Sequence, residues 1–125
     1  MPFTLFVDER WILDQAESRV PGDPDVTDFG SIAAAVARHR AEVMGVLVYA
    51  EPHHRAAALL HQLVRVPALE HSNEFLGVGV AVAYLTASGK VVKVSSDEAV
   101  DLAVSVAVGS ADVRQVAAAL KSWAQ

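Results

Sequence analysis

The segment of this sequence best suited to chemistry is a short polar loop, residues 66–74, between two apolar helical runs. The second run begins near Phe75 and is rich in small and apolar residues. The first turn of a helix has backbone N–H groups without intrahelical partners and carries the positive end of the helix dipole, so the loop before it is a suitable place for phosphate. Whether this loop binds phosphate depends on its side chains.

Three neighbouring residues of the loop, Glu70, His71 and Ser72, are of the types that form a nucleophilic triad. We expect no triad, because residues adjacent in a loop do not converge on one point as a triad requires. The histidines also predict no metal site. His54 and His61 are seven residues apart, whereas two ligands on one helix are usually four apart.

Three aspartates, Asp23, Asp25 and Asp28, precede the second predicted helix. Turns favour Asp and a helix N-terminus stabilises negative charge, whereas a calcium loop needs more ligands at regular alternation. We therefore interpret these aspartates as turn and capping residues. Trp11 and Trp123 are expected in the core or along a groove, and an exposed one would be a candidate anchor for a partner.

Hydrophobic periodicity predicts six helices. They are expected near residues 8–19, 32–39, 52–65, 73–87, 96–108 and 110–123. The fourth is apolar nearly all round, which is typical of a helix with neighbours on every side, and Gly77 and Gly79 would let those neighbours approach closely. The expected fold is therefore all-α: one domain over residues 1–125, with about six helices in a compact bundle around this central apolar helix.

Two further segments bear on whether the fold also contains a short β-hairpin. Residues 42–49 are apolar and β-branched around Gly45, which helix and strand both explain, and the helical neighbours favour a helix. Residues 91–94 predict an extended segment that could form half of a hairpin.

Composition limits the function. With 53% hydrophobic residues and no cysteine, the 125 residues can form one core without disulfides or cysteine-bound metal, which fits a reducing cytoplasm. A net charge of −5 disfavours nucleic acid as a partner. The longest apolar run is about 13 residues, short of a membrane span, and the first residues lack the pattern of a signal peptide. We expect a cytoplasmic protein that binds neither nucleic acid nor membrane.

Several strings, in this order, resemble the Doc (death on curing) branch of the Fic/Doc superfamily over roughly residues 25–123. Residues 27–30 are similar to the family's early Asp-x-Gly turn, and residues 57–65 look like the helix leading into its active loop. Residues 84–89 resemble the exit of the next helix, and the last two helices also look like those of the family. The resemblance implies a Fic/Doc-like helical fold and transfer of phosphate or a nucleoside monophosphate from a nucleotide to a protein hydroxyl.

The family's signature loop reads approximately H-x-F-x-[DN]-[AG]-N-K-R. Seven of the nine positions in this pattern are specified. In this sequence they fall, in order, on Pro67, Leu69, His71, Ser72, Asn73, Glu74 and Phe75. The general base thus falls on Pro67, which cannot titrate, and the acidic magnesium ligand falls on His71, a poor ligand for that ion. Asn73 is retained. The family's lysine and arginine, which hold phosphates, fall on Glu74 and Phe75, an anion and an apolar residue, so a nucleotide would be repelled.

The resemblance, with this loop, implies the toxin-side component of a toxin–antitoxin pair that binds a Phd-like antitoxin and is catalytically inactive, with no cofactor and no metal. In the family the antitoxin's C-terminal helix lies in a groove near the N-terminal helices of the toxin, and such a groove needs none of the loop residues. The alternative is an active transferase that uses ATP and Mg by a shifted mechanism, with His71 as base and with Ser72 and Asn73 as candidate nucleotide contacts. Homo-oligomerisation stays open.

Overall fold

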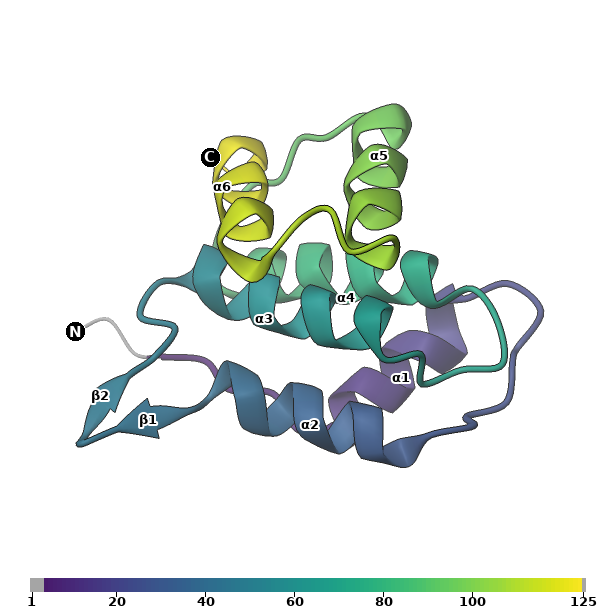
Figure 1. Cartoon of the computed structure of the whole chain (residues 1–125), viewed down its shortest axis with the longest axis horizontal. Helices are drawn as coiled ribbons and strands as arrows, with labels where there is room; N and C mark the ends of the chain where they lie inside the picture. Colours follow the sequence, from purple (N-terminus) through teal and green to yellow (C-terminus); the bar gives the residue numbers. More distant parts are fainter. Residues whose placement is uncertain (1–3, 125) are drawn as a thin grey trace.

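The structure, a computed structural model, describes residues 4–124 and contains six helices and a two-stranded hairpin in that range. In chain order the elements are α1 (Glu9–Arg19), α2 (Phe29–His39), β1 (Glu42–Val43), β2 (Val46–Leu47), α3 (Pro52–Arg65), α4 (Asn73–Ala87), α5 (Ser96–Ala107) and α6 (Val113–Trp123). Figure 1 shows α3 and α4 in the middle, with α1 and α2 on one side and α5 and α6 on the other. The prediction of an all-α bundle of six helices is confirmed.

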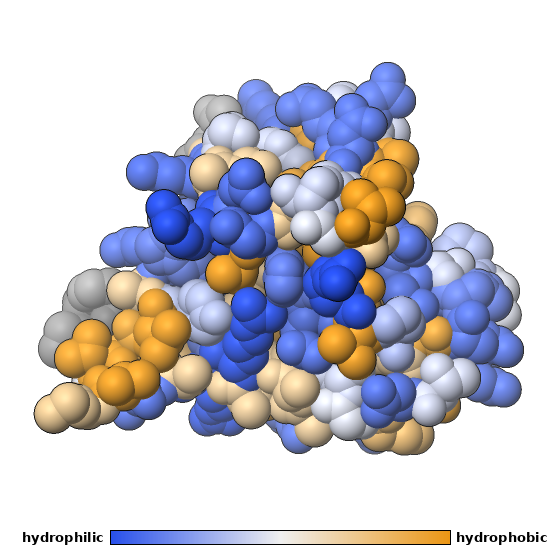
Figure 2. All heavy atoms as spheres, in the orientation of Figure 1, coloured by the Kyte–Doolittle hydropathy of each residue, from blue (hydrophilic) through white to orange (hydrophobic). Residues whose placement is uncertain are grey.

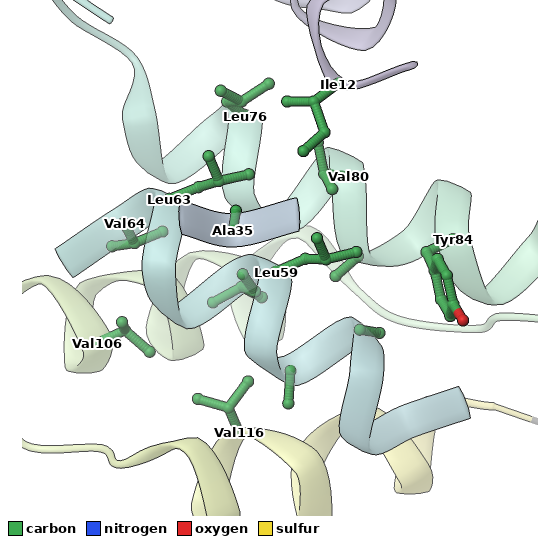
Figure 3. Close-up of a cluster of buried hydrophobic side chains, with 14 of the residues drawn as sticks. Ile12, Ala35, Leu59, Leu63, Val64, Leu76, Val80, Tyr84, Val106 and Val116 are labelled. Atoms are coloured by element: carbon green, nitrogen blue, oxygen red, sulfur yellow. The ribbon is translucent and has the colours of Figure 1, made fainter. Parts of the chain in front are cut away.

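The centre of the bundle is α3. It packs against α2, α4, α5 and α6, and its buried side chains include Leu59, Leu60 and Leu63. Figure 3 shows side chains from the surrounding helices, such as Ala35 and Val116, pointing toward it. The prediction that the fourth helix has neighbours on every side was wrong. α4 packs against α1, α3 and α5, and part of its N-terminal half borders a groove.

The two glycines of α4 differ in their surroundings. A Cβ on Gly77 would lie 2.5 Å from Val64 Cγ2 and 3.4 Å from the carbonyl oxygen of Leu60, so this glycine lets α3 and α4 approach closely, as predicted. A Cβ on Gly79 would meet nothing nearer than Arg19 Cδ at 4.0 Å. The expectation of close packing at Gly79 was therefore wrong, because that side of α4 faces the groove.

Side-chain caps fix the ends of several helices. Asp8 Oδ1 accepts a hydrogen bond from the backbone N–H of Trp11 at the start of α1. A capping box of Ser95 and Glu98, a pattern that the sequence shows directly, is present at the start of α5. A second capping box, which the sequence reading missed, joins Asp112 and Gln115, so the last helix begins after Asp112 rather than at residue 110.

The segment 42–49 forms the hairpin of β1 and β2 instead of the expected helix. Its two turn residues, Met44 and Gly45, have φ angles of 52° and 79°. Two successive residues in the left-handed region make the two-residue turn that suits the twist of a hairpin, and this turn outweighed the helical neighbours. Residues 91–94 form no strand: only an isolated bridge joins Val92 to Ala124. Within residues 4–124 no helix is long and apolar enough to cross a membrane.

Candidate functional site

The predicted loop joins α3 to α4 at the end of the molecule opposite the hairpin (Figure 1). Backbone hydrogen bonds hold it against residues 25–28. The N–H of Thr27 donates to the carbonyl of Ala68 at 2.8 Å, and the N–H of Glu70 donates to the carbonyl of Asp25 at 3.0 Å. These contacts tie the loop to a segment far earlier in the chain and give it a defined shape.

Asn73, the first residue of α4, holds the loop from inside. Its side chain is buried, and its Oδ1 accepts hydrogen bonds from the N–H groups of Ala68 at 3.0 Å and Leu69 at 2.9 Å. Its Nδ2 donates to the carbonyl of Leu69 at 3.0 Å. The three bonds satisfy backbone groups that would otherwise be buried without partners. Ser72, before it, lies in the left-handed region with φ 65°.

The seven residues assigned to the signature positions differ in burial. Leu69 and Asn73 are buried, Ser72 is half-buried, and the other four are exposed: Pro67, His71, Glu74 and Phe75. Residues 66–75 contain two glutamates and no lysine or arginine. The amides at the start of α4 therefore face a loop without cationic side chains. The assignment of the catalytic, metal and nucleotide positions to these residues stays a prediction.

His71 and Ser72 lie closer together than the sequence reading expected. His71 Nδ1 and Ser72 Oγ are 2.8 Å apart, a hydrogen bond. The third residue of the suggested triad does not join them, because Glu70 Oε1 accepts a hydrogen bond from the N–H of Asp25 at 3.0 Å. A histidine–hydroxyl pair is therefore present, but the carboxylate that would orient the histidine is turned to another partner.

A groove of about 660 Å³ opens beside the loop, between α4 and α5, with the end of α1 at its edge. Apolar residues from both helices line it: Phe75, Val78, Ala99, Val100, Ala103 and Val104. Phe75, Val100 and Val104 are each about half exposed or more. The charged lining residues are Arg19 and Glu74, and the guanidinium of Arg19 donates through Nε to Gln15 Oε1 at 2.6 Å. The groove is thus apolar along its length with one charge of each sign.

The remaining sequence candidates are dispersed. In residues 4–124 no three His, Asp or Glu side chains come together in a way that could hold a metal ion. Asp28 occupies the N-cap position of α2, although its side chain makes no capping hydrogen bond. Asp23 lies in a turn with φ 46°. Trp123 is buried and belongs to the core. Trp11 is half-buried and lines a second hollow of about 390 Å³.

A buried polar cluster that was not predicted from the sequence lies under the N-terminal segment. Arg55 Nε donates to Tyr84 Oη at 2.7 Å, and the hydroxyl of Tyr84 donates to the carbonyl of Leu5. His39 lies edge-on to Tyr84, and its Nε2 accepts from the N–H of Val7 at 3.0 Å. One signal was available: Arg55 lies four residues before Leu59, so it shares the apolar face of α3.

The histidine of this cluster is held neutral. Its Nδ1 lies 2.6 Å from the carbonyl of Val36, which requires a proton on Nδ1, and its Nε2 must be unprotonated to accept from Val7. Burial lowers the pKa of His39 below its ordinary value, against the opposite effect of the hydrogen bond to Val36, and the positive charges of Arg40 and Arg55 add to the lowering. The cluster therefore fastens the N-terminal segment to α2 and α4 through an uncharged imidazole.

The fold and the loop together define a helical domain with its candidate site at the start of α4. Comparison with known proteins gives this class a name. The chain is 33% identical over 123 residues to a protein of Mycolicibacterium smegmatis (strain ATCC 700084 / mc(2)155) called Toxin Doc, a match that covers 97% of this chain and 95% of that protein. No model of a protein family matches the sequence. Because the two chains align over nearly their full lengths, this chain belongs to the Doc toxin family.

Proposed function

We propose that this protein is the toxin-side component of a toxin–antitoxin pair and that it acts by binding protein, without transferase activity. Membership of the Doc toxin family supports the first part of the proposal. The second part rests on one observation: the groove at the start of α4 is lined by Glu74 and Phe75, where the family's signature has the lysine and arginine that hold phosphates.

The chemistry of the loop supports the loss of transfer activity. Pro67 offers no general base, and a missing general base typically costs about 10²–10⁴ in rate. The imidazole of His71 is a poor ligand for magnesium. Glu74 places a negative charge in the first turn of α4, where the phosphates of a nucleotide would have to lie. These losses affect proton transfer, metal binding and charge neutralisation separately, so their effects on the rate multiply.

The shape of the groove supports a protein partner. Exposed valines on α5 face Phe75 and Val78 on α4, and this is the kind of surface onto which an amphipathic helix places its apolar side. The helix of a Phd-like antitoxin is the partner that we propose. The groove differs from the one expected from the sequence, because it lies between α4 and α5 and its lining includes Glu74 and Phe75 from the signature positions. Opposite charges are expected on it: a basic residue near Glu74 and an acidic residue near Arg19.

Titration with ATP and magnesium tests the loss of chemistry. We expect no heat of binding for the natural chain in calorimetry. A restored loop serves as the positive control and carries Pro67→His, His71→Asp, Ser72→Gly, Glu74→Lys and Phe75→Arg. The restored chain should bind ATP and modify a target hydroxyl, with elongation factor Tu as the first candidate that the Doc resemblance suggests. Transfer of phosphate or AMP by the natural chain would overturn the inactive assignment.

Co-expression with the product of the neighbouring reading frame tests the partner. We expect a stable complex with a small antitoxin. Val100→Asp, inside the groove, should weaken the complex at least tenfold, because it buries an unpaired charge. Val108→Asp is the matched control, since Val108 is exposed at the end of the same helix and lies outside the groove. Equal effects of the two variants would place the partner elsewhere.

One observation keeps the alternative function in view, namely the 2.8 Å contact between His71 Nδ1 and Ser72 Oγ. A histidine in this position could act as the base of a shifted transferase mechanism. If the alternative holds, the natural chain labels a target protein from ATP in the presence of magnesium, and His71→Ala abolishes the labelling. Mass analysis of the candidate target decides between the two functions.

A further inference from the structure

The hairpin carries an apolar face without a partner in the described chain. Glu42 pairs with Leu47 and Val43 pairs with Val46 in the antiparallel register, and the N–H of Val48 donates to the carbonyl of Ala41 at 2.9 Å. Because side chains alternate along a strand, Val43, Val46 and Val48 lie on one face and Glu42 and Leu47 on the other.

This face is unusually exposed for its composition. The exposed fractions are 62% for Val43, 68% for Val46 and 50% for Val48, and Met44 at the tip of the turn is 98% exposed. Figure 2 shows the apolar atoms gathered at the lower left, over the position of the hairpin. A hairpin normally turns its apolar side to the core and its polar side to water, and here the solvent-facing side is the apolar one.

The size of the patch is that of an interaction surface. From the exposed fractions above, the four residues together expose roughly 500 Å², backbone included, which is comparable to the largest apolar patch on a typical monomer. Two such patches pressed together would bury about 1,000 Å², the lower limit for a specific protein–protein contact. The backbone groups on the outer edges of both strands are also open, because the sheet has two strands only among the described residues.

We propose that this face is the contact between two copies of the chain, which meet hairpin to hairpin about a two-fold axis. The face contains no charged side chain, so identical copies meet there without like-charge repulsion, while the net charge of −5 opposes association through most of the remaining surface. In a two-fold contact the same patch serves both partners, so Val43, Met44, Val46 and Val48 of one copy cover the same residues of the other.

The proposed dimer is independent of the loop chemistry. Figure 1 places the hairpin at the opposite end of the molecule from residues 66–72, and none of the four apolar hairpin residues lines the groove between α4 and α5. Both grooves therefore stay open in the dimer, which would bind two antitoxin helices.

Sedimentation over a range of concentrations from about 1 µM to about 500 µM tests the proposal. The apparent mass of the natural chain should rise with concentration from 13 kDa toward twice that value. Val46→Lys should raise the dissociation constant at least tenfold, because it places two like charges across the axis. Val108→Lys is the control, since Val108 is 70% exposed and caps the end of α5, a helix that lies away from the hairpin in Figure 1. A natural chain that remains monomeric, or a Val46→Lys chain that still dimerises, overturns the proposal.

The absence of cysteine provides a second, independent measurement. Met44→Cys introduces the sole thiol of the chain, and mild oxidation should cross-link it to the same residue of the second copy. Val108→Cys should give little cross-linked product under the same conditions. Circular dichroism of each variant excludes misfolding as the cause. Equal cross-linking of the two variants, or capture of the hairpin by a different protein alone, would show that the face is not a self-contact.

Discussion

Gly77 and Gly79 allow the packing of α3 against α4 to be measured by substitution. Both glycines lie inside α4, so Gly→Ala at either position gains the same helix propensity, about 0.5–1 kcal/mol. The two differ in what the new methyl group meets. At Gly79 it has space, with Arg19 Cδ as the nearest atom at 4.0 Å. At Gly77 it would lie 2.5 Å from Val64 Cγ2, a separation that real Cβ atoms do not have.

The expected effects have opposite signs. Gly79→Ala should raise the free energy of unfolding by about 0.5–1 kcal/mol. At Gly77 the branched side chain of Val64 is stiff and the carbonyl oxygen of Leu60 lies at 3.4 Å, so the helices must separate slightly. Overpacking of this kind costs about 1–3 kcal/mol. After subtraction of the helix propensity, Gly77→Ala should lower the free energy of unfolding by up to about 2 kcal/mol.

Urea unfolding followed by circular dichroism measures both values on the same scale. The difference between the two variants, about 1–3 kcal/mol, is the quantity that depends on the packing alone. If Gly77→Ala is as stable as Gly79→Ala, then α3 and α4 do not approach as closely as described. A crystal structure of Gly77→Ala should show Val64 in a changed rotamer or the helices moved apart.

Three further predictions concern the loop and the buried cluster. Asn73→Ala should destabilise the protein by about 2–4 kcal/mol in unfolding curves, because it leaves three loop backbone groups without partners. Asn73→Asp should also destabilise it, because a carboxylate oxygen would then face the carbonyl of Leu69 where the amide now donates. Tyr84→Phe removes the acceptor of Arg55 Nε and should cost about 1–3 kcal/mol in the same assay. The pKa of His39 is lowered in the folded protein, so the folded state binds fewer protons than the unfolded state. The contribution of His39 to the free energy of unfolding is therefore complete above about pH 6.5. It is lost at up to about 1.4 kcal/mol per pH unit as the pH falls toward the folded-state pKa. His39→Gln should reduce the slope of stability against pH in unfolding measured between about pH 7 and 5, and the part that remains includes His53 and His61, whose pKa values burial also lowers.

Helices could be predicted from the sequence because their signals are local. The capping box at Ser95 and the recurrence of apolar residues every three to four positions fixed α5 and α3 to within a residue or two. The hairpin could not be predicted in this way. Val43 and Val46 fit either structure, and what decided between them was the left-handed conformation of Met44, a residue type that rarely adopts it.

The candidate site was located by sequence, but its surroundings were not. The position of the loop before α4 and the burial of Leu69 follow from the order of apolar and polar residues. The groove depends on how α5 crosses α4, and the contact of the loop with residues 25–28 joins segments about forty residues apart in the chain. Neither has a local signal. The neutral His39 was missed for the same reason, since its partner Val7 lies on a separate segment.

Burial divides the residues that we assign to the signature positions into two groups. Leu69 is buried against the bundle, and Asn73 supplies three hydrogen bonds that shape the loop. Both positions would be costly to change whether or not the protein transfers phosphate. Pro67, His71 and Glu74 are exposed, so a change of residue at these positions costs the fold little. Retention at the two buried positions, with departure at the exposed ones, is what the proposed loss of catalysis predicts for a loop that must still fold.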